Sequence, residues 1–118
     1  MDQHIADKLS EQFRAAWMGP EYARCRGWFE ARASLDAAEK LGDDWDGQGA
    51  PAVHKDAVAW ARKAAQCMAA CGFTAPDRVV AGVGGTIHFE WRDAAGHYFE
   101  VEASEEGVAA FCCLPRIT

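Results

Sequence analysis

Polar residues suited to chemistry concentrate in two alternating stretches in the last third of the chain. Their carboxylates, imidazole, guanidinium and phenol could bind a basic partner, hold a divalent cation or take part in acid–base catalysis. These residues are His88, Glu90, Arg92, Tyr98, Glu100 and Glu102. Which role is available depends on the elements that position the six side chains.

The alternation of polar and apolar residues over 86–103 predicts a β-hairpin with one apolar face and one polar, acidic face. The apolar side chains on its two arms are Ile87, Phe89, Trp91, Phe99, Val101 and Ala103. Placing Phe99 opposite Trp91 leaves a loop over 94–96, with Gly96 at the position that adopts a left-handed backbone. A loop one residue shorter or longer would mix the two faces.

The same register fixes the neighbours of the carboxylates. It places Glu90 opposite Glu100, and such a pair of like charges is mildly destabilising unless another group compensates. His88 lies opposite Glu102. Arg92 is diagonal to Glu100, and we expect it to reduce the repulsion.

Three interpretations of the polar face remain open. It is a solvated sheet surface, a docking surface for a basic partner, or a metal or acid–base site. A metal site requires several oxygens at fixed distances, whereas a flat sheet spreads its side chains. The sequence therefore favours docking over metal binding, with the six polar residues as the partner-binding surface.

The loop over 43–51 resembles a calcium-binding loop only superficially. Asp44 and two further oxygen-bearing side chains precede Gly49, but the twelfth position is Lys55, where a bidentate glutamate is required. We therefore expect an Asx-rich connection in which Trp45 enters the core.

No other motif assigns a catalytic or cofactor role. The segment Gly82-Val83-Gly84-Gly85 lacks the lysine and hydroxyl residue of a phosphate loop and indicates a tight turn. Cys67 and Cys71 share one side of an expected helix, but that side is apolar, which favours buried thiols over metal ligands. The sequence predicts no catalytic residue, no metal ligand and no cofactor.

Composition and charge limit the classes of function. The 118-residue chain has a net charge of −6, which argues against direct binding to nucleic acid and favours basic partners. Five Trp and six Phe suffice for a core without metal or disulfide bonds. The five cysteines lack a secreted spacing, and no segment is apolar enough for a signal peptide or membrane span. We expect a cytoplasmic protein that contacts no membrane.

The remaining patterns predict a single α+β domain over 1–118. A helical region over 1–42 precedes a loop, a helix and an antiparallel β-meander of three to four strands over 43–118. The helices are expected over 3–17, 20–41 (unless Gly27 divides it) and 54–71.

Apolar spacing predicts the buried sides of these elements. In the second helix it includes Phe29 and Leu35. The stripe of the third helix is Ala57, Trp60, Ala64, Cys67 and Cys71. The first strand is expected at Val79-Val80. The last, over 108–114, has few charges and would form a homodimer by strand addition if its edge is unpaired.

Two segments also carry a family resemblance. Residues 45–51 (WDGQGAP) and 84–91 (GGTIHFEW) are similar to segments of small, uncharacterised bacterial and phage-associated proteins. In that group a W-D-G-x-G-A-x-P-like loop precedes a helix, and a G-G-x-x-x-x-E-W-like strand opens a meander. The resemblance covers 41–108 and implies a cytoplasmic α+β domain. It is compatible with an antitoxin-like or anti-defence accessory protein, and it carries no known activity.

The sequence thus predicts a small acidic, non-enzymatic protein-interaction module, such as an inhibitor. It would dock on a larger, partly basic protein through the acidic sheet face or the N-terminal helical region. The alternative is a metal-dependent hydrolase or nuclease that uses the same carboxylates.

Overall fold

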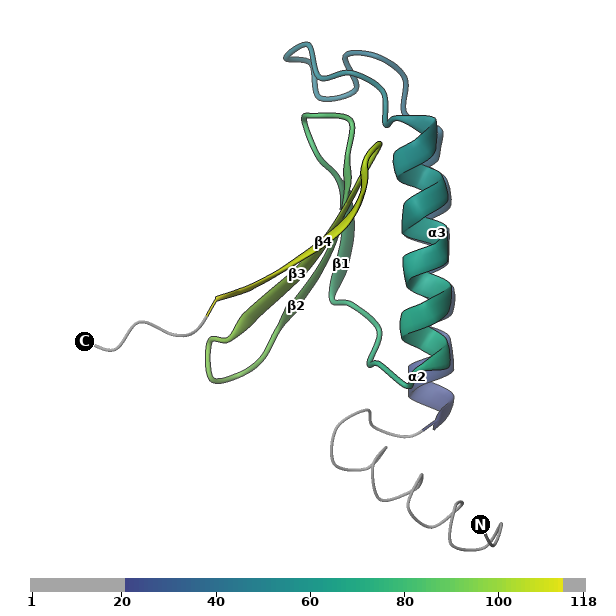
Figure 1. Ribbon diagram of the computed structural model, residues 1–118, viewed down its shortest axis with the longest axis vertical. Coiled ribbons are helices and arrows are strands. Elements are labelled where there is room, and N and C mark those ends of the chain that lie inside the picture. The colour runs from purple at the N-terminus through teal and green to yellow at the C-terminus, as the bar shows by residue number, and fades with distance from the viewer. Residues whose placement is uncertain (1–20, 114–118) are drawn as a thin grey trace, which may run out of the picture.

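A computed structural model describes residues 21–113 of the chain (Figure 1). The expected helix over 3–17 lies outside the described residues. The described elements are α2 (Glu21–Glu39), α3 (Lys55–Ala70), β1 (Arg78–Ala81), β2 (Ile87–Arg92), β3 (Tyr98–Ser104) and β4 (Gly107–Cys113). The predicted α+β fold class is confirmed, because helices precede an antiparallel sheet.

The described residues form two layers. The strands make one antiparallel sheet in the order β1-β2-β3-β4, and both helices lie against the same face of it (Figure 1). α2 packs on β1, whereas α3 packs on β2, β3 and β4 and against α2. We call the sheet face under the helices the inner face and the opposite one the outer face. Neither α2 nor α3 has the length and apolar content that a membrane-crossing helix needs.

The predicted hairpin register is confirmed. Trp91 pairs with Phe99, and every pair between β2 and β3 follows the expected alignment. In the loop, the Asp93 N–H donates to the His97 carbonyl, and Gly96 has a φ of 87°. Glycine adopts this left-handed backbone without the clash that a Cβ would cause. Turn chemistry and apolar pattern therefore select the same register.

The core lies between the inner face and the helices. Ile87 and Phe89 of β2 and Leu35 of α2 are its largest fully buried side chains. Burial of a side chain of this size contributes about 1.5–3 kcal/mol to the free energy of unfolding. Because the three come from both layers, their burial holds helix and sheet together.

The buried side of α2 is rotated from the predicted one. Trp28 is buried, and its indole N–H donates to the Phe73 carbonyl at 2.8 Å. Phe29, which the apolar spacing placed inside, is exposed. That prediction is wrong by one residue, because an aromatic pair at 28 and 29 fits a helical stripe in either phase. The buried positions are Trp28, Ala31, Leu35 and Ala38.

α2 continues through Gly27, where the sequence left a break open. A Cβ at this position would lie 2.7 Å from the Cβ of Ala75. Glycine is needed here because the segment before β1 passes close to the helix. The helix ends at Glu39, shortly before the expected end at Leu41.

α3 has the predicted ends but a different buried side. Nδ1 of His54 accepts the Asp56 N–H at the N-terminus, and Cys71 is the C-terminal cap. Trp60, Cys67 and Cys71 are exposed, so the prediction of buried thiols is wrong. Small side chains let the helix lie close to the sheet, and the larger indole is moved to its flank. The buried residues are Ala57, Val58, Ala61 and Ala65.

Aspartates hold the loop between the helices. Oδ1 of Asp46 accepts the N–H groups of Gln48 at 2.8 Å and Ala50 at 3.0 Å. These bonds lower the pKa of Asp46, because they favour the charged carboxylate. Oδ1 of Asp44 accepts the Gly49 N–H at 2.6 Å. The Asx-rich connection expected from the sequence is therefore present.

Trp45 closes this loop and does not enter the core. Its indole N–H donates to the Pro51 carbonyl at 3.0 Å, and its side chain is only partly buried. The prediction of a core position is wrong because the indole finds its hydrogen-bond partner within the loop.

Candidate functional site

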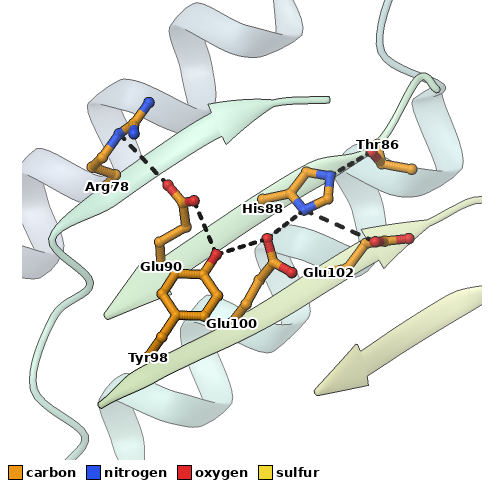
Figure 2. A network of polar contacts seen from close by, with 7 residues as sticks. All are labelled: Arg78, Thr86, His88, Glu90, Tyr98, Glu100 and Glu102. Carbon is orange, nitrogen blue, oxygen red and sulfur yellow. Dashed lines mark hydrogen bonds and ion pairs between the residues drawn. The ribbon is translucent and has the colours of Figure 1, made fainter. Parts of the chain in front are cut away.

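The six predicted site residues share the outer face of the sheet, away from the helices. Figure 2 shows seven side chains of this region joined by polar contacts, with helix ribbons behind the strands. We call this set the acidic network. Its members are Arg78, Thr86, His88, Glu90, Tyr98, Glu100 and Glu102. The sixth predicted residue, Arg92, lies beside the network, with its guanidinium 4.9 Å from the centre of the Tyr98 ring.

Tyr98 lies between the two glutamates that the register sets opposite each other. Its hydroxyl is 3.0 Å from Oε1 of Glu90 and 3.1 Å from Oε1 of Glu100. A phenol has one proton, so the two carboxylates share a single donor. Burial, followed by the hydrogen bonds to Glu90 and Glu100, raises the pKa of Tyr98 above its ordinary value of 10.0. The phenol therefore stays protonated as a donor near neutral pH.

His88 links the carboxylates of β3 to the turn before β2. Its Nδ1 is 2.9 Å from Oε1 of Glu100, and its Nε2 is 2.8 Å from Oγ1 of Thr86. A neutral imidazole with its proton on Nδ1 satisfies both contacts, because Nε2 then accepts the threonine O–H. Oε2 of Glu102 is 3.9 Å from the same Nδ1. One ring thus lies between two carboxylates and a hydroxyl.

Arg78 is a cation of the network that the sequence analysis did not identify. Its Nε lies 3.5 Å from Oε2 of Glu90, an oxygen that is buried and accepts no hydrogen bond from the described residues. The Arg78 side chain is largely exposed, so this ion pair compensates Glu90 only in part. Arg92 was expected to relieve the repulsion at Glu100, whereas the structure stacks it on Tyr98.

Arg78 and Thr86, which the hairpin pattern alone leaves out, both follow from the register of the segments next to it. Val79 and Val80 predict a strand, but only its alignment with β2 brings Arg78 opposite Glu90. Thr86 is two residues before His88, so both side chains lie on the same side of the chain. The alternating pattern therefore contains the signal, provided that it is extended across the turn at 82–85.

The network is less exposed than an ordinary solvated sheet face. The side chains of Glu90, His88 and Glu100 are 16%, 20% and 20% exposed, respectively. That of Glu102 is 34% exposed. Charges with little solvent around them are screened less than charges in open water. Glu102 is the network carboxylate most accessible to a partner, and Glu90 and Glu100 add a negative field from below the surface.

The order of contacts from Thr86 through His88 to Glu100 is that of hydroxyl, imidazole and carboxylate in nucleophilic triads. However, the backbone of Gly82 lies against the hydroxyl. A Cβ on Gly82 would clash with Oγ1 of Thr86 and lie 2.5 Å from Nε2 of His88. The chain itself therefore occupies space beside the hydroxyl that a substrate would need. This geometry suits binding better than covalent catalysis.

Metal binding was the other chemistry considered for these carboxylates. Among residues 21–113, no group of three or more His, Cys, Asp or Glu side chains is arranged to hold a metal ion. In the acidic network, the imidazole and the phenol lie between the carboxylates, so the oxygens are spread along the sheet.

A hollow of about 300 Å³ adjoins the acidic network at Thr86 and Glu102. Nε2 of His54 lies at its rim, 3.1 Å from Oε2 of Glu105. The side chains that line it include His54, Thr86, Glu102, Ser104, Glu105 and Glu106. The negative surface therefore continues from β3 to the turn between β3 and β4.

Comparisons with known proteins add nothing to this geometry. No family model matches the chain, and neither a curated protein nor a solved structure is similar enough to match it. The function is therefore inferred from the site itself.

Proposed function

We propose that this protein is a non-enzymatic interaction module whose outer sheet face docks on a larger, partly basic protein. The observation that carries the proposal is the convergence of Glu90, Glu100 and Glu102 on a face that α2 and α3 leave open. An inhibitor, or an antitoxin-like or anti-defence accessory protein, works in this way, because it occupies its partner's surface without performing chemistry.

The charges of the network support a basic protein as the partner. Three carboxylates share the face with two arginines, Arg78 and Arg92, so the surface keeps a net negative charge. Like charges held together reduce stability, and a basic partner offsets that cost when it binds. The same field repels phosphates, which makes direct binding to nucleic acid unfavourable.

Aromatic and arginine side chains around the carboxylates supply the contacts that make binding strong. Arg92 stacks on Tyr98, and Phe111 of β4 lies opposite Glu100 with about half of its surface exposed. Tyr, Trp and Arg carry a large share of the binding energy in protein interfaces. The face thus combines charge for orientation with anchors for affinity.

The proposal is tested by affinity capture from lysates of the native host and of the cells on which this protein would act. The bait is the whole chain, compared with Glu102→Gln, which removes the most accessible charge and keeps the side-chain volume. Glu30→Gln on α2 is the matched control, because it changes the net charge equally on the helix layer. The proposal is supported by a captured protein whose recovery falls at least several-fold with the Glu102→Gln bait and does not fall with the Glu30→Gln bait. Equal recovery by all three baits contradicts it.

A metal-dependent hydrolase or nuclease is the second candidate, because one imidazole nitrogen lies within 3.9 Å of two carboxylates. A thermal-shift titration with Mg²⁺, Mn²⁺, Zn²⁺ and Ca²⁺ distinguishes this candidate function from docking. A specific site raises Tm with ion concentration, and the rise disappears in Glu100→Gln. An unchanged Tm with every ion argues against this candidate.

The reducing cytoplasm is the location that fits the thiols. Cys67, Cys71 and Cys112 are free and exposed, and oxidising compartments convert such thiols into disulfides. Fractionation of the native host, with detection of the chain in each compartment, tests this part of the proposal.

A further inference from the structure

β4 is an edge strand with an unusual composition. Among residues 21–113 it pairs with β3 alone, and its sequence GVAAFCC contains no charged residue and no proline. Val108 and Phe111, whose side chains lie on opposite faces of the strand, are each about half exposed. Protected edges normally carry lysine, proline or a bulge, because unpaired N–H and C=O groups recruit other strands. β4 has an open apolar edge without the first two of these protections.

The flank of α3 beside β4 also carries exposed apolar side chains, together with Lys63, whose Nζ lies 5.3 Å from the centre of the Trp60 ring. Arg62 on the other flank forms ion pairs with Asp36 at 2.9 Å and Glu39 at 2.8 Å, both on α2. The helical period therefore turns Trp60 and Cys67 away from α2, toward the side on which β4 lies. Both are exposed. Exposed apolar side chains thus lie on two neighbouring elements, the edge strand and the helix above it, and the Lys63 ammonium group lies over the Trp60 ring.

We infer that a second copy of this chain covers this surface by antiparallel pairing of β4 with β4 about a two-fold axis at Ala110. Ala110 would then lie opposite its own equivalent, and Val108 opposite Cys112. An axis at the middle residue of Gly107–Cys113 uses the whole strand and keeps the inner faces of both copies on the same side. The product is a continuous eight-stranded sheet with both acidic networks on one surface.

Side-chain size and charge fit this register. On the outer face, Phe111 would lie opposite Ala109 of the second copy, so a large residue covers a small one. The acidic turns at Glu105 and Glu106 would lie at opposite ends of the paired strands, which separates like charges.

The spacing of the layers also favours a second copy. α3 packs on β3 and β4, and β3 would lie three strand spacings, about 14 Å, from its equivalent. The two α3 helices of the dimer would be separated by about the same distance. Helices in direct contact are about 8–10 Å apart, so the extra space between the two α3 helices suits a large side chain such as Trp60 from each. One symmetry operation thus covers both the strand edge and the helix flank.

This inference does not use the glutamates of the proposed docking face, and Phe111 of β4 is the residue that borders both surfaces.

Light scattering over a concentration series tests the inference. The wild-type chain is expected to reach the mass of a dimer, and Ala110→Lys is expected to be monomeric, because it places two lysines opposite each other at the axis. Val83→Lys, in the exposed turn before β2, is the matched control and is expected to remain dimeric. A wild-type monomer at all concentrations, or a dimer that survives Ala110→Lys, overturns the proposal.

Cross-linking tests the register and covers the case in which Ala110→Lys does not fold. In a background with the five cysteines changed to serine, Ala110→Cys places two thiols on opposite residues, with Cα atoms about 5.5 Å apart. Mild oxidation should give a covalent dimer. Ala109→Cys is the control, because its equivalents would be diagonal, about 7–8 Å apart, and should cross-link much less. Equal cross-linking of both variants, or none, contradicts the proposed axis.

Discussion

The two acidic regions of the molecule use their carboxylates in different ways. In the loop between the helices, Asp44 and Asp46 accept backbone N–H groups. On the sheet, the polar contacts of Glu90 and Glu100 within residues 21–113 are with side chains, above all the hydroxyl of Tyr98. A bond to the backbone fixes the path of the chain, whereas a side-chain contact can be exchanged for a partner's without unfolding. The loop carboxylates therefore serve folding, and the sheet carboxylates are available for binding.

The largest effect is expected from Asp46→Ala. The change removes the acceptor of two backbone N–H groups and leaves the loop without its turn-forming side chain. Tm should fall by several degrees in thermal unfolding followed by circular dichroism. Partner capture at a temperature where the variant is folded should be unchanged, because the loop lies outside the acidic network.

Asp46→Asn and acid give the matched tests of this prediction. The amide oxygen can still accept both bonds, so Asn should restore most of the lost Tm. Because the folded-state pKa of Asp46 is lowered from 3.8, its contribution is present above pH 3.8 and is lost as pH falls through the folded value. The difference in stability between wild type and Asp46→Asn should therefore shrink in acid. A constant difference would contradict the role assigned to this carboxylate.

Tyr98→Phe should have the next largest effect. It removes the one donor between Glu90 and Glu100 and leaves two carboxylates facing each other. The expected loss is about 0.5–1.5 kcal/mol of the free energy of unfolding, measured by urea denaturation. Glu90→Gln in the Tyr98→Phe background should recover part of the loss, since it removes one of the repelling charges. No loss in Tyr98→Phe would show that the hydroxyl does not hold the pair.

The hairpin could be predicted fully from the sequence because two independent signals agree there. Alternation sets the faces, and Gly96 sets the loop length, so only one register satisfies both. The ends of α3 were also predictable, since His54 and Gly72 flank an uninterrupted helical pattern. Local chemistry decides such features, and the chain displays that chemistry directly.

The buried sides of the helices were not predictable in the same way. α3 is rich in alanine on several sides, so hydrophobicity alone does not show which side meets the sheet, and Trp60 was placed inside when it lies on the flank. On the outer face, the six predicted residues follow from the hairpin, five of them in the acidic network, but Arg78 requires the pairing of β1 with β2. Contacts between elements depend on packing, which no single segment encodes.

Alkaline pH should separate wild type from Tyr98→Phe by a smaller amount. The folded chain holds the phenol proton more tightly than the unfolded chain, because the pKa of Tyr98 is raised by burial and by the two glutamates. This contribution is fully present below pH 10.0 and is lost as pH rises through the folded pKa. Urea denaturation over a pH series should show wild type losing more stability than Tyr98→Phe above pH 10.0. Parallel profiles for the two chains would contradict the shift.

Glu102→Gln should change stability least. A small effect is what distinguishes the sheet carboxylates from the loop carboxylates. Glu102 is the most exposed network carboxylate, and its Oε2 approaches Nδ1 of His88 only to 3.9 Å. Loss of that weak contact is offset by lower repulsion from Glu100, so the free energy of unfolding should stay within about 0.5 kcal/mol of wild type. Urea denaturation measures this. A loss as large as that of Asp46→Ala would mean that the sheet carboxylates also serve folding, and the distinction between the two regions would fail.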